Sequence, residues 1–285
     1  MTLEYWYVFP AAVIIATTAM ASGIGGATFF SPLFILVLGL PPQVAIGTGL
    51  MTEVFGFASG VLAYARKRFI DYRLAGALLS VTIPCALFGT WVSTHIDPVI
   101  LKVILGTGLF AVAASFLKAP DHDEVLKMNL QISRDYPPSK AETCLYTRDD
   151  EKICYTVCNR TEGRIIAGLG GLFVGLISTG LGELNDYFLL QRCRVPSRVS
   201  IGTGILVIAL TVLTASIGHF IRFIQEGGPV LSTVLSIVMF SVPGVIIGGQ
   251  IGPYFAGRIP ARTLTRILGV LFIGIAALTL GEVLL

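Results

Sequence analysis

Apolar runs of roughly 17 to 22 residues, close to the length that crosses a bilayer, recur along almost the whole chain and restrict its possible folds. Of the 285 residues, 54% are hydrophobic and 13% are charged. Soluble domains contain about 25% charged residues. The sequence therefore predicts an all-α membrane protein with several crossings.

The first apolar run, residues 5–20, has some features of a signal peptide. A signal peptide begins with a positively charged region, but no Lys or Arg precedes this run, and Glu4 is acidic. We therefore expect it to be the first membrane helix.

The apolar segments form two groups of five, separated by a polar stretch at 118–163 that carries three cysteines and many charges. This division predicts an N-terminal transmembrane repeat at 1–117, a polar loop at 118–163 and a C-terminal transmembrane repeat at 164–285. The order of the loop is not assured by its composition. The predicted membrane segments are 6–22, 28–40, 44–65, 73–92, 98–117, 164–179, 183–193, 198–222, 229–250 and 262–284.

The two groups resemble copies of one unit. The sequence Ile-Gly-Thr-Gly-Leu at 46–50 recurs 155 residues later as Ile-Gly-Thr-Gly-Ile at 201–205. Further matches follow in the same order, including Pro84 with Pro243 and Gly89 with Gly248. A series of matches in one order indicates a duplication. Because each unit has an odd number of segments, the second copy is expected to be inverted, as in many secondary transporters.

The distribution of Lys and Arg predicts the orientation. If all ten segments cross, 18 of the 20 basic residues lie on one side, and only Lys102 and Arg222 lie on the other. The positive-inside rule then places the 118–163 loop in the cytoplasm and both termini outside, in a multi-pass inner (cell) membrane protein. If 28–40 and 183–193 were re-entrant, the basic cluster at 66–73 would lie on the other side of the membrane from those at 192–198 and 258–266. The excess of basic residues on one side would then be weaker.

The second segment of each half is short and follows a glycine cluster. Short, glycine-interrupted segments at matching positions in two halves indicate a transporter binding site. Glycine allows the backbone to break and approach a ligand. The helix that begins at the break presents free N–H groups to an anion. The alternative is that these glycines only allow close helix packing.

The motifs that surround these breaks carry a family resemblance. Ser-Gly-Ile-Gly-Gly at 22–26, Pro32, and Leu-Pro-Pro-Gln-Val-Ala-Ile-Gly-Thr at 40–48 resemble the N-terminal signature of the sulfite exporter TauE/SafE family. The segment at 59–73 is similar to the next hairpin of that family. The glycine cluster at 180–185 departs from the simpler pattern and resembles a variant of it. The resemblance implies export of sulfite, an organosulfonate or a related oxyanion from the cytoplasm.

We expect the anion to bind between the glycine-broken helices of the two repeats. The candidate substrate-binding residues are Ser22, Gly23, Gly25, Gly26, Thr48, Ser178, Gly180, Gly182, Asn185 and Thr203, and the candidate coupling or gating residues are Glu53, Glu183 and Asp186. Glu183 is either a proton-linked switch or a first-turn carboxylate that complements the helix dipole. The two threonines either donate to the anion or bond their own helix carbonyls.

Other functional classes receive less support. The sequence contains no metalloprotease, nucleophile-elbow or phosphate-loop motif, so we expect neither an enzyme nor a cofactor. A net charge of +3 does not indicate nucleic acid. The partners expected are the small anion, membrane lipid and a second copy in a homodimer, while a non-transporting scaffold or assembly factor stays an alternative. A cytoplasmic loop argues against disulfides, and a single loop histidine argues against a metal site.

Overall fold

The computed structural model describes residues 3–22, 27–117, 122–135, 143–148, 150–255 and 261–284. After a short 3₁₀ turn, η1 (Leu3–Tyr5), each predicted apolar segment forms helix, and the boundaries agree within a few residues. The first half contains α1 (Val8–Ser22), α2 (Ala27–Leu36), α3 (Pro42–Arg66), α4 (Tyr72–His95) and α5 (Pro98–Leu117). The second half contains α7 (Arg160–Ile177), α8 (Leu181–Asp186), the π-helix η2 (Tyr187–Arg192), α9 (Ser197–Glu226), α10 (Gly228–Phe255) and α11 (Ala261–Leu284).

Four helical stretches in the described residues are long and apolar enough to cross a membrane: 42–66, 72–95, 197–226 and 228–251. Shorter apolar stretches lie at 8–18, 98–114 and 269–282. Many large apolar side chains on these helices are exposed, including Phe88, Trp91 and Val270. A soluble protein does not expose so much apolar surface. The fold is therefore that of a helical membrane protein.

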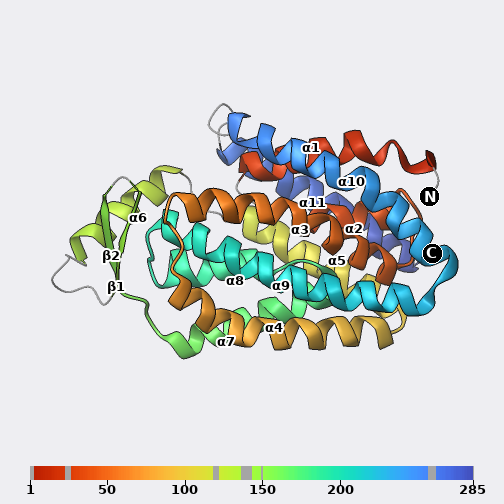
Figure 1. The fold of residues 1–285 in the computed structure, drawn as a ribbon, viewed down its shortest axis with the longest axis horizontal. Coiled ribbons are helices and arrows are strands. Elements are labelled where there is room, and N and C mark those ends of the chain that lie inside the picture. The colour runs from red at the N-terminus through yellow and green to blue at the C-terminus, as the bar shows by residue number, and fades with distance from the viewer. Residues whose placement is uncertain are drawn as a thin grey trace.

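Both termini lie at one end of the helix bundle, and a small module of α6 (His122–Asp135), β1 (Thr143–Tyr146) and β2 (Lys152–Tyr155) lies at the other end (Figure 1). Two contacts place basic clusters at the module end. The Arg148 N–H donates to the Lys67 carbonyl over 3.3 Å, and Arg198 pairs with Glu151 at 3.1 Å. This arrangement requires an odd number of crossings in each half. The inversion of one half relative to the other stays a prediction.

Helices of the two halves pack against one another: α1 against α10, α4 against α7, α5 against α11 and α3 against α9. In Figure 1, the first two of these pairs lie along opposite edges of the bundle. Glycines allow the closest approach. A Cβ atom on Gly175 of α7 would lie 2.2 Å from the Ala86 carbonyl oxygen of α4, and one on Gly89 of α4 would lie 2.3 Å from the Leu172 carbonyl oxygen. Small residues at such crossings let two membrane helices pack backbone to backbone.

Within the polar loop, β1 and β2 form an antiparallel hairpin with Cys144 opposite Cys154. The expectation against disulfides is wrong in this structure. Cys144 is bonded to Cys154, and Cys158 is bonded to Cys193, which lies just after η2. The hairpin register brings the first pair together, and the return of η2 to the module end brings the second. Sequence spacing does not reveal this return.

Helix α7, which forms the predicted segment 164–179, begins four residues earlier than that prediction. Helix α7 starts at Arg160, because the Asn159 side chain accepts hydrogen bonds from the Thr161 and Glu162 backbone N–H groups. Asparagine is among the preferred residues at this capping position.

Candidate functional site

The predicted helix break in the second half lies between α7 and α8. Ser178 and Gly180 both adopt left-handed backbone conformations, with φ values of 57° and 103°. Such conformations favour glycine and end a helix. The chain therefore stops α7 inside the bundle, turns, and returns through α8 and η2 toward the module end. This return is also fixed at its far end, where Arg192 of η2 pairs with Glu162 of α7 at 3.2 Å.

The break contacts the short helix of the other half through two serines. The Ser178 hydroxyl is hydrogen-bonded to the Ser31 hydroxyl of α2, and the two side chains are 1% and 0% exposed. Helix α3 closes over this pair, because a Cβ atom on Gly49 would lie 2.7 Å from Ser31 Oγ. This hydrogen bond links α2 to the break that precedes α8. Ser31 was not predicted, although a hydroxyl directly before Pro32, among apolar neighbours, is a usable signal.

Asn185, a predicted binding residue on α8, supplies a hydrogen-bond donor. Its side chain is 2% exposed, and its Nδ2 atom has no hydrogen-bond partner among the described residues. A buried amide without a partner costs free energy, so such a group commonly marks a ligand site. Gly182, one helical turn earlier, has only the Ile208 side chain near its missing Cβ position, at 3.5 Å.

The three predicted coupling residues come together from both halves. Glu53 of α3 is 2% exposed, and neither carboxylate oxygen has a hydrogen-bond partner among the residues described. The carboxylate of Glu183 on α8 interacts electrostatically with the carboxylates of Glu53 and Asp186. Glu183 also hydrogen-bonds to the backbone at Gly180, where α8 begins. Its carboxylate therefore lies at the N-terminus of α8 and is also part of an acidic cluster with Glu53 and Asp186.

Two observations bear on what this acidic cluster can bind. Within the described part of the chain, no group of three His, Cys, Asp or Glu residues has the geometry to hold a metal ion. The cluster of Glu53, Glu183 and Asp186 also presents only carboxylates. When ionised, these groups repel an anion nearby.

The hydroxyls of the two repeated threonines have different partners. The Thr203 hydroxyl accepts a 3.0 Å hydrogen bond from the Asp71 N–H at the module end. The Thr48 hydroxyl donates over 2.7 Å to the Val44 carbonyl in its own helix. Both threonines are thus engaged by backbone groups. Gly23, Gly25 and Gly26 lie outside the described residues, as does the side chain of Ser22.

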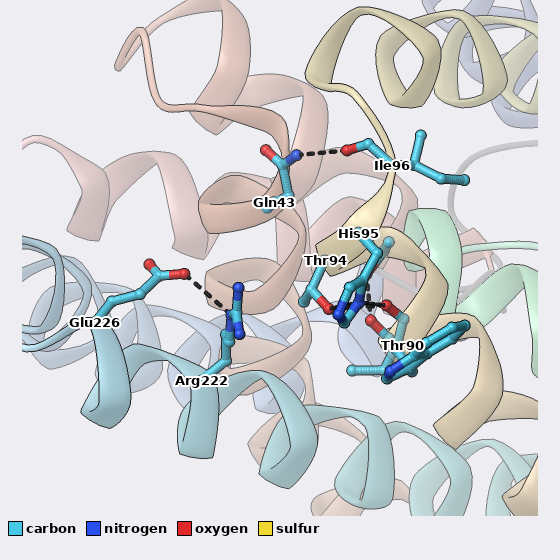
Figure 2. A network of polar contacts seen from close by, with 9 residues as sticks. Gln43, Thr90, Thr94, His95, Ile96, Arg222 and Glu226 are labelled. Carbon is cyan, nitrogen blue, oxygen red and sulfur yellow. Dashed lines mark hydrogen bonds and ion pairs between the residues drawn. The ribbon is translucent and has the colours of Figure 1, made fainter.

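Thr48 belongs to the first turns of α3, and this end of α3 lies far from the module. There, the Gln43 amide donates over 3.3 Å to the Ile96 carbonyl that follows α4 (Figure 2). The two basic residues predicted for this side are both paired with glutamates: Arg222 with Glu226 at 3.2 Å and Lys102 with Glu282 at 2.9 Å. Their charges are therefore largely compensated locally.

Comparison with known proteins gives one family. The profile of the family described as sulfite exporter TauE/SafE matches residues 8–279. The chain is 24% identical to the probable membrane transporter protein YunE of Bacillus subtilis, over 92% of each chain. It is 27% identical to the probable membrane transporter protein YjnA of Bacillus subtilis, over 83% of this chain and 86% of that protein. A probable membrane transporter protein of Xylella fastidiosa is 24% identical, over 89% and 86% respectively. No solved structure matches the chain.

Proposed function

This chain belongs to the sulfite exporter TauE/SafE family of membrane transporters, and from that premise we propose that it exports a small oxyanion, such as sulfite or an organosulfonate. The anion binds beside Ser31 and Ser178, where the broken helices of the two halves meet. The observation that carries this proposal is the buried Asn185 Nδ2 on the helix that follows the break, a donor without a partner in the described residues. Family membership and the names of the relatives also identify a transporter rather than an enzyme.

The proposed direction is outward, from the cytoplasm. An inside-negative membrane potential drives a monovalent anion outward with about 2.3 kcal/mol per 100 mV. Export down this potential needs no fixed cation at the site. The acidic cluster of Glu53, Glu183 and Asp186 then acts as a gate, since ionised carboxylates repel the anion and protonated ones admit it.

The proposed orientation places the module in the cytoplasm and both termini outside an inner membrane. Two basic clusters in short connections, 66–73 and 192–198, are at the module end. At the opposite end, Lys102 and Arg222 are each paired with a glutamate. The positive-inside rule favours the cytoplasm for the end with the basic excess.

A non-transporting scaffold is the second candidate, and the disulfide-bonded module favours it. Such a protein would act through the hairpin and its partners rather than through the helix breaks. The two functions differ in which part of the chain is essential. Changing the exposed hairpin residues Tyr146 and Lys152, which leaves the buried Tyr155 in place, spares the flux of a transporter, and changing Asn185 spares the activity of a scaffold.

The direct test is anion flux through the purified full chain in liposomes, with and without an imposed potential. Sulfite and methanesulfonate are the probes, and the variants are Asn185→Leu and the matched control Thr107→Val, whose hydroxyl bonds only its own helix. We expect potential-driven flux in the wild type and the control, and a loss of at least about tenfold in Asn185→Leu, the effect of roughly 1.4 kcal/mol. Absence of flux for both anions contradicts an oxyanion carrier of this type. Equal flux in all three proteins contradicts the site.

A further inference from the structure

A second polar site lies where the module meets the bundle. A cavity of about 230 Å³ opens between the hairpin and the first turns of α4 and α7. Three arginines line it: Arg73, Arg160 and Arg164. Helix α7 has 18 residues, so its two ends are about 27 Å apart at 1.5 Å per residue. Since Arg160 begins this helix and Ser178 follows it, the cavity lies on the module side of the Ser31–Ser178 pair, and Phe188 in its wall lies about one helical turn beyond Asn185.

The carboxylates around this cavity already have partners. One Asp71 oxygen accepts from the Arg73 and Leu74 backbone N–H groups at 2.9 Å, and the other accepts from the Tyr155 hydroxyl at 2.7 Å. The neighbouring acidic residues Glu162 and Glu151 pair with Arg192 and Arg198.

Two of the three arginines, Arg73 and Arg164, are not neutralised in this way. Within the described part of the chain, no ion pair joins Arg73 or Arg164 to a carboxylate. The cavity therefore has an excess of positive charge in a concave setting, and guanidinium groups bind phosphate, sulfonate and carboxylate oxygens through paired N–H donors.

The remaining wall of the cavity is apolar. Leu74, Leu78 and Phe188 line it and are 9%, 2% and 2% exposed. Just outside, Tyr72 and Ile165 are 64% and 61% exposed, on the first turns of the same two helices. The mouth therefore lies where the apolar outer surface of the bundle meets the polar module. A ligand here has a charged head against the arginines inside the cavity, and an apolar chain that leaves it can lie on exposed side chains such as Tyr72 and Ile165.

We propose that this cavity binds the oxyanion head of an amphipathic anion. Basic pockets between membrane helices bind anionic lipid head groups for the same reasons of charge and position. The volume is below the roughly 300–1,000 Å³ of sites that enclose drug-sized ligands, so the cavity holds a head group and leaves a chain outside. A phospholipid and a soluble alkyl sulfonate share this chemistry. The site does not depend on which anion the protein exports.

The test uses the full chain with its disulfides intact and compares two sources of the anion. In the lipid arm, phosphatidylcholine nanodiscs with and without phosphatidylglycerol are used, and retained lipid is counted by native mass spectrometry. In the soluble arm, octanesulfonate binding is measured in neutral detergent, with inorganic phosphate as the head group alone. The variant is Arg73→Gln with Arg164→Gln. The control is Arg66→Gln, an exposed arginine of the same end outside the cavity.

We expect the double variant to bind at least one of the two amphipathic anions about tenfold more weakly, since each charge-assisted pair contributes about 1.5 kcal/mol or more. The control keeps wild-type binding. Selective loss in the lipid arm identifies a lipid site, and selective loss in the soluble arm identifies a site for a free amphipathic anion. Equal binding by the double variant and the wild type in both arms overturns the proposal. An unchanged thermal unfolding midpoint shows that the variant is folded.

Discussion

The Tyr155 hydroxyl of the hairpin donates a 2.7 Å hydrogen bond to Asp71, the residue that caps α4. Tyr155 is 0% exposed, although it belongs to the polar module. The same carboxylate accepts from the first N–H groups of α4 with its other oxygen. One side chain therefore fixes both the start of a membrane helix and the seat of the module on the bundle.

We expect Tyr155→Phe to lower the free energy of unfolding by about 1.5–3 kcal/mol, because the buried Asp71 oxygen loses its donor. The ring still fills its site, so packing is preserved. Unfolding in mixed detergent micelles, followed by circular dichroism, measures this change. Tyr146→Phe on the exposed side of β1 is the control, and it should change nothing.

The hydrogen bond between Tyr155 and Asp71 also predicts that the free energy of unfolding depends on pH. Burial, together with the hydrogen bond to Asp71, raises the pKa of Tyr155 above its ordinary value of 10.0. A raised tyrosine pKa means that the folded state holds its proton more tightly than the unfolded state. The stabilisation of the fold that results from this raised pKa is fully present below pH 10 and is lost as the pH rises further. Wild type should lose stability above pH 10 more steeply than Tyr155→Phe, and parallel curves for the two proteins contradict the assignment.

The membrane helices could be predicted from the sequence because their lengths and apolar composition are set by the bilayer. The glycine break of the second half could also be predicted, since few other residues adopt the backbone conformation of Gly180. The meeting of Ser31 with Ser178 could not, because it depends on how two distant short helices pack. The disulfide to Cys193 was missed for a similar reason. It requires η2 to return to the module end, which no local pattern specifies.

Gly175 and Gly76 give a matched pair for testing helix packing. An added Cβ at Gly175 would meet backbone atoms of α4 at 2.2 and 2.6 Å, whereas nothing lies within 4 Å of that position at Gly76. Backbone atoms cannot move aside as a flexible side chain can. We expect Gly175→Ala to destabilise the protein by about 1–3 kcal/mol through overpacking. Gly76→Ala should be neutral or stabilise by up to about 1 kcal/mol. Equal unfolding midpoints for the two variants contradict the close crossing.

The Cys158–Cys193 disulfide should stabilise the module more than the Cys144–Cys154 disulfide does. Its sequence separation is 35 residues, compared with 10, and longer closed loops lose more chain entropy on cross-linking. We expect Cys193→Ser to cost about 2–4 kcal/mol and Cys144→Ser to cost less. Thermal unfolding with and without reductant measures both effects. Cys85→Ser is the control, because Cys85 is a free cysteine.

The disulfides also test the proposed orientation. Cytoplasmic thiols are kept reduced, and the disulfides found there are mostly transient or redox-sensing. If the module is cytoplasmic, the four cysteines of the two disulfides should react with maleimide in lysed growing cells. After an oxidant is added, they should no longer react with maleimide. Protection without added oxidant places the module on the oxidising side and contradicts the proposed orientation.

Glu53 distinguishes a gating role from a structural one. A buried carboxylate without a hydrogen-bond partner destabilises the fold, so Glu53→Met should raise the free energy of unfolding by about 1–3 kcal/mol. If the acidic cluster gates the anion by taking up protons, Glu53→Gln should make flux less dependent on pH, because one titrating charge is removed. Flux in liposomes across a pH series measures this dependence. Glu226→Gln, at the exposed Arg222 ion pair far from the module, is the control. A pH profile of Glu53→Gln that matches the wild type leaves Glu53 without a part in gating.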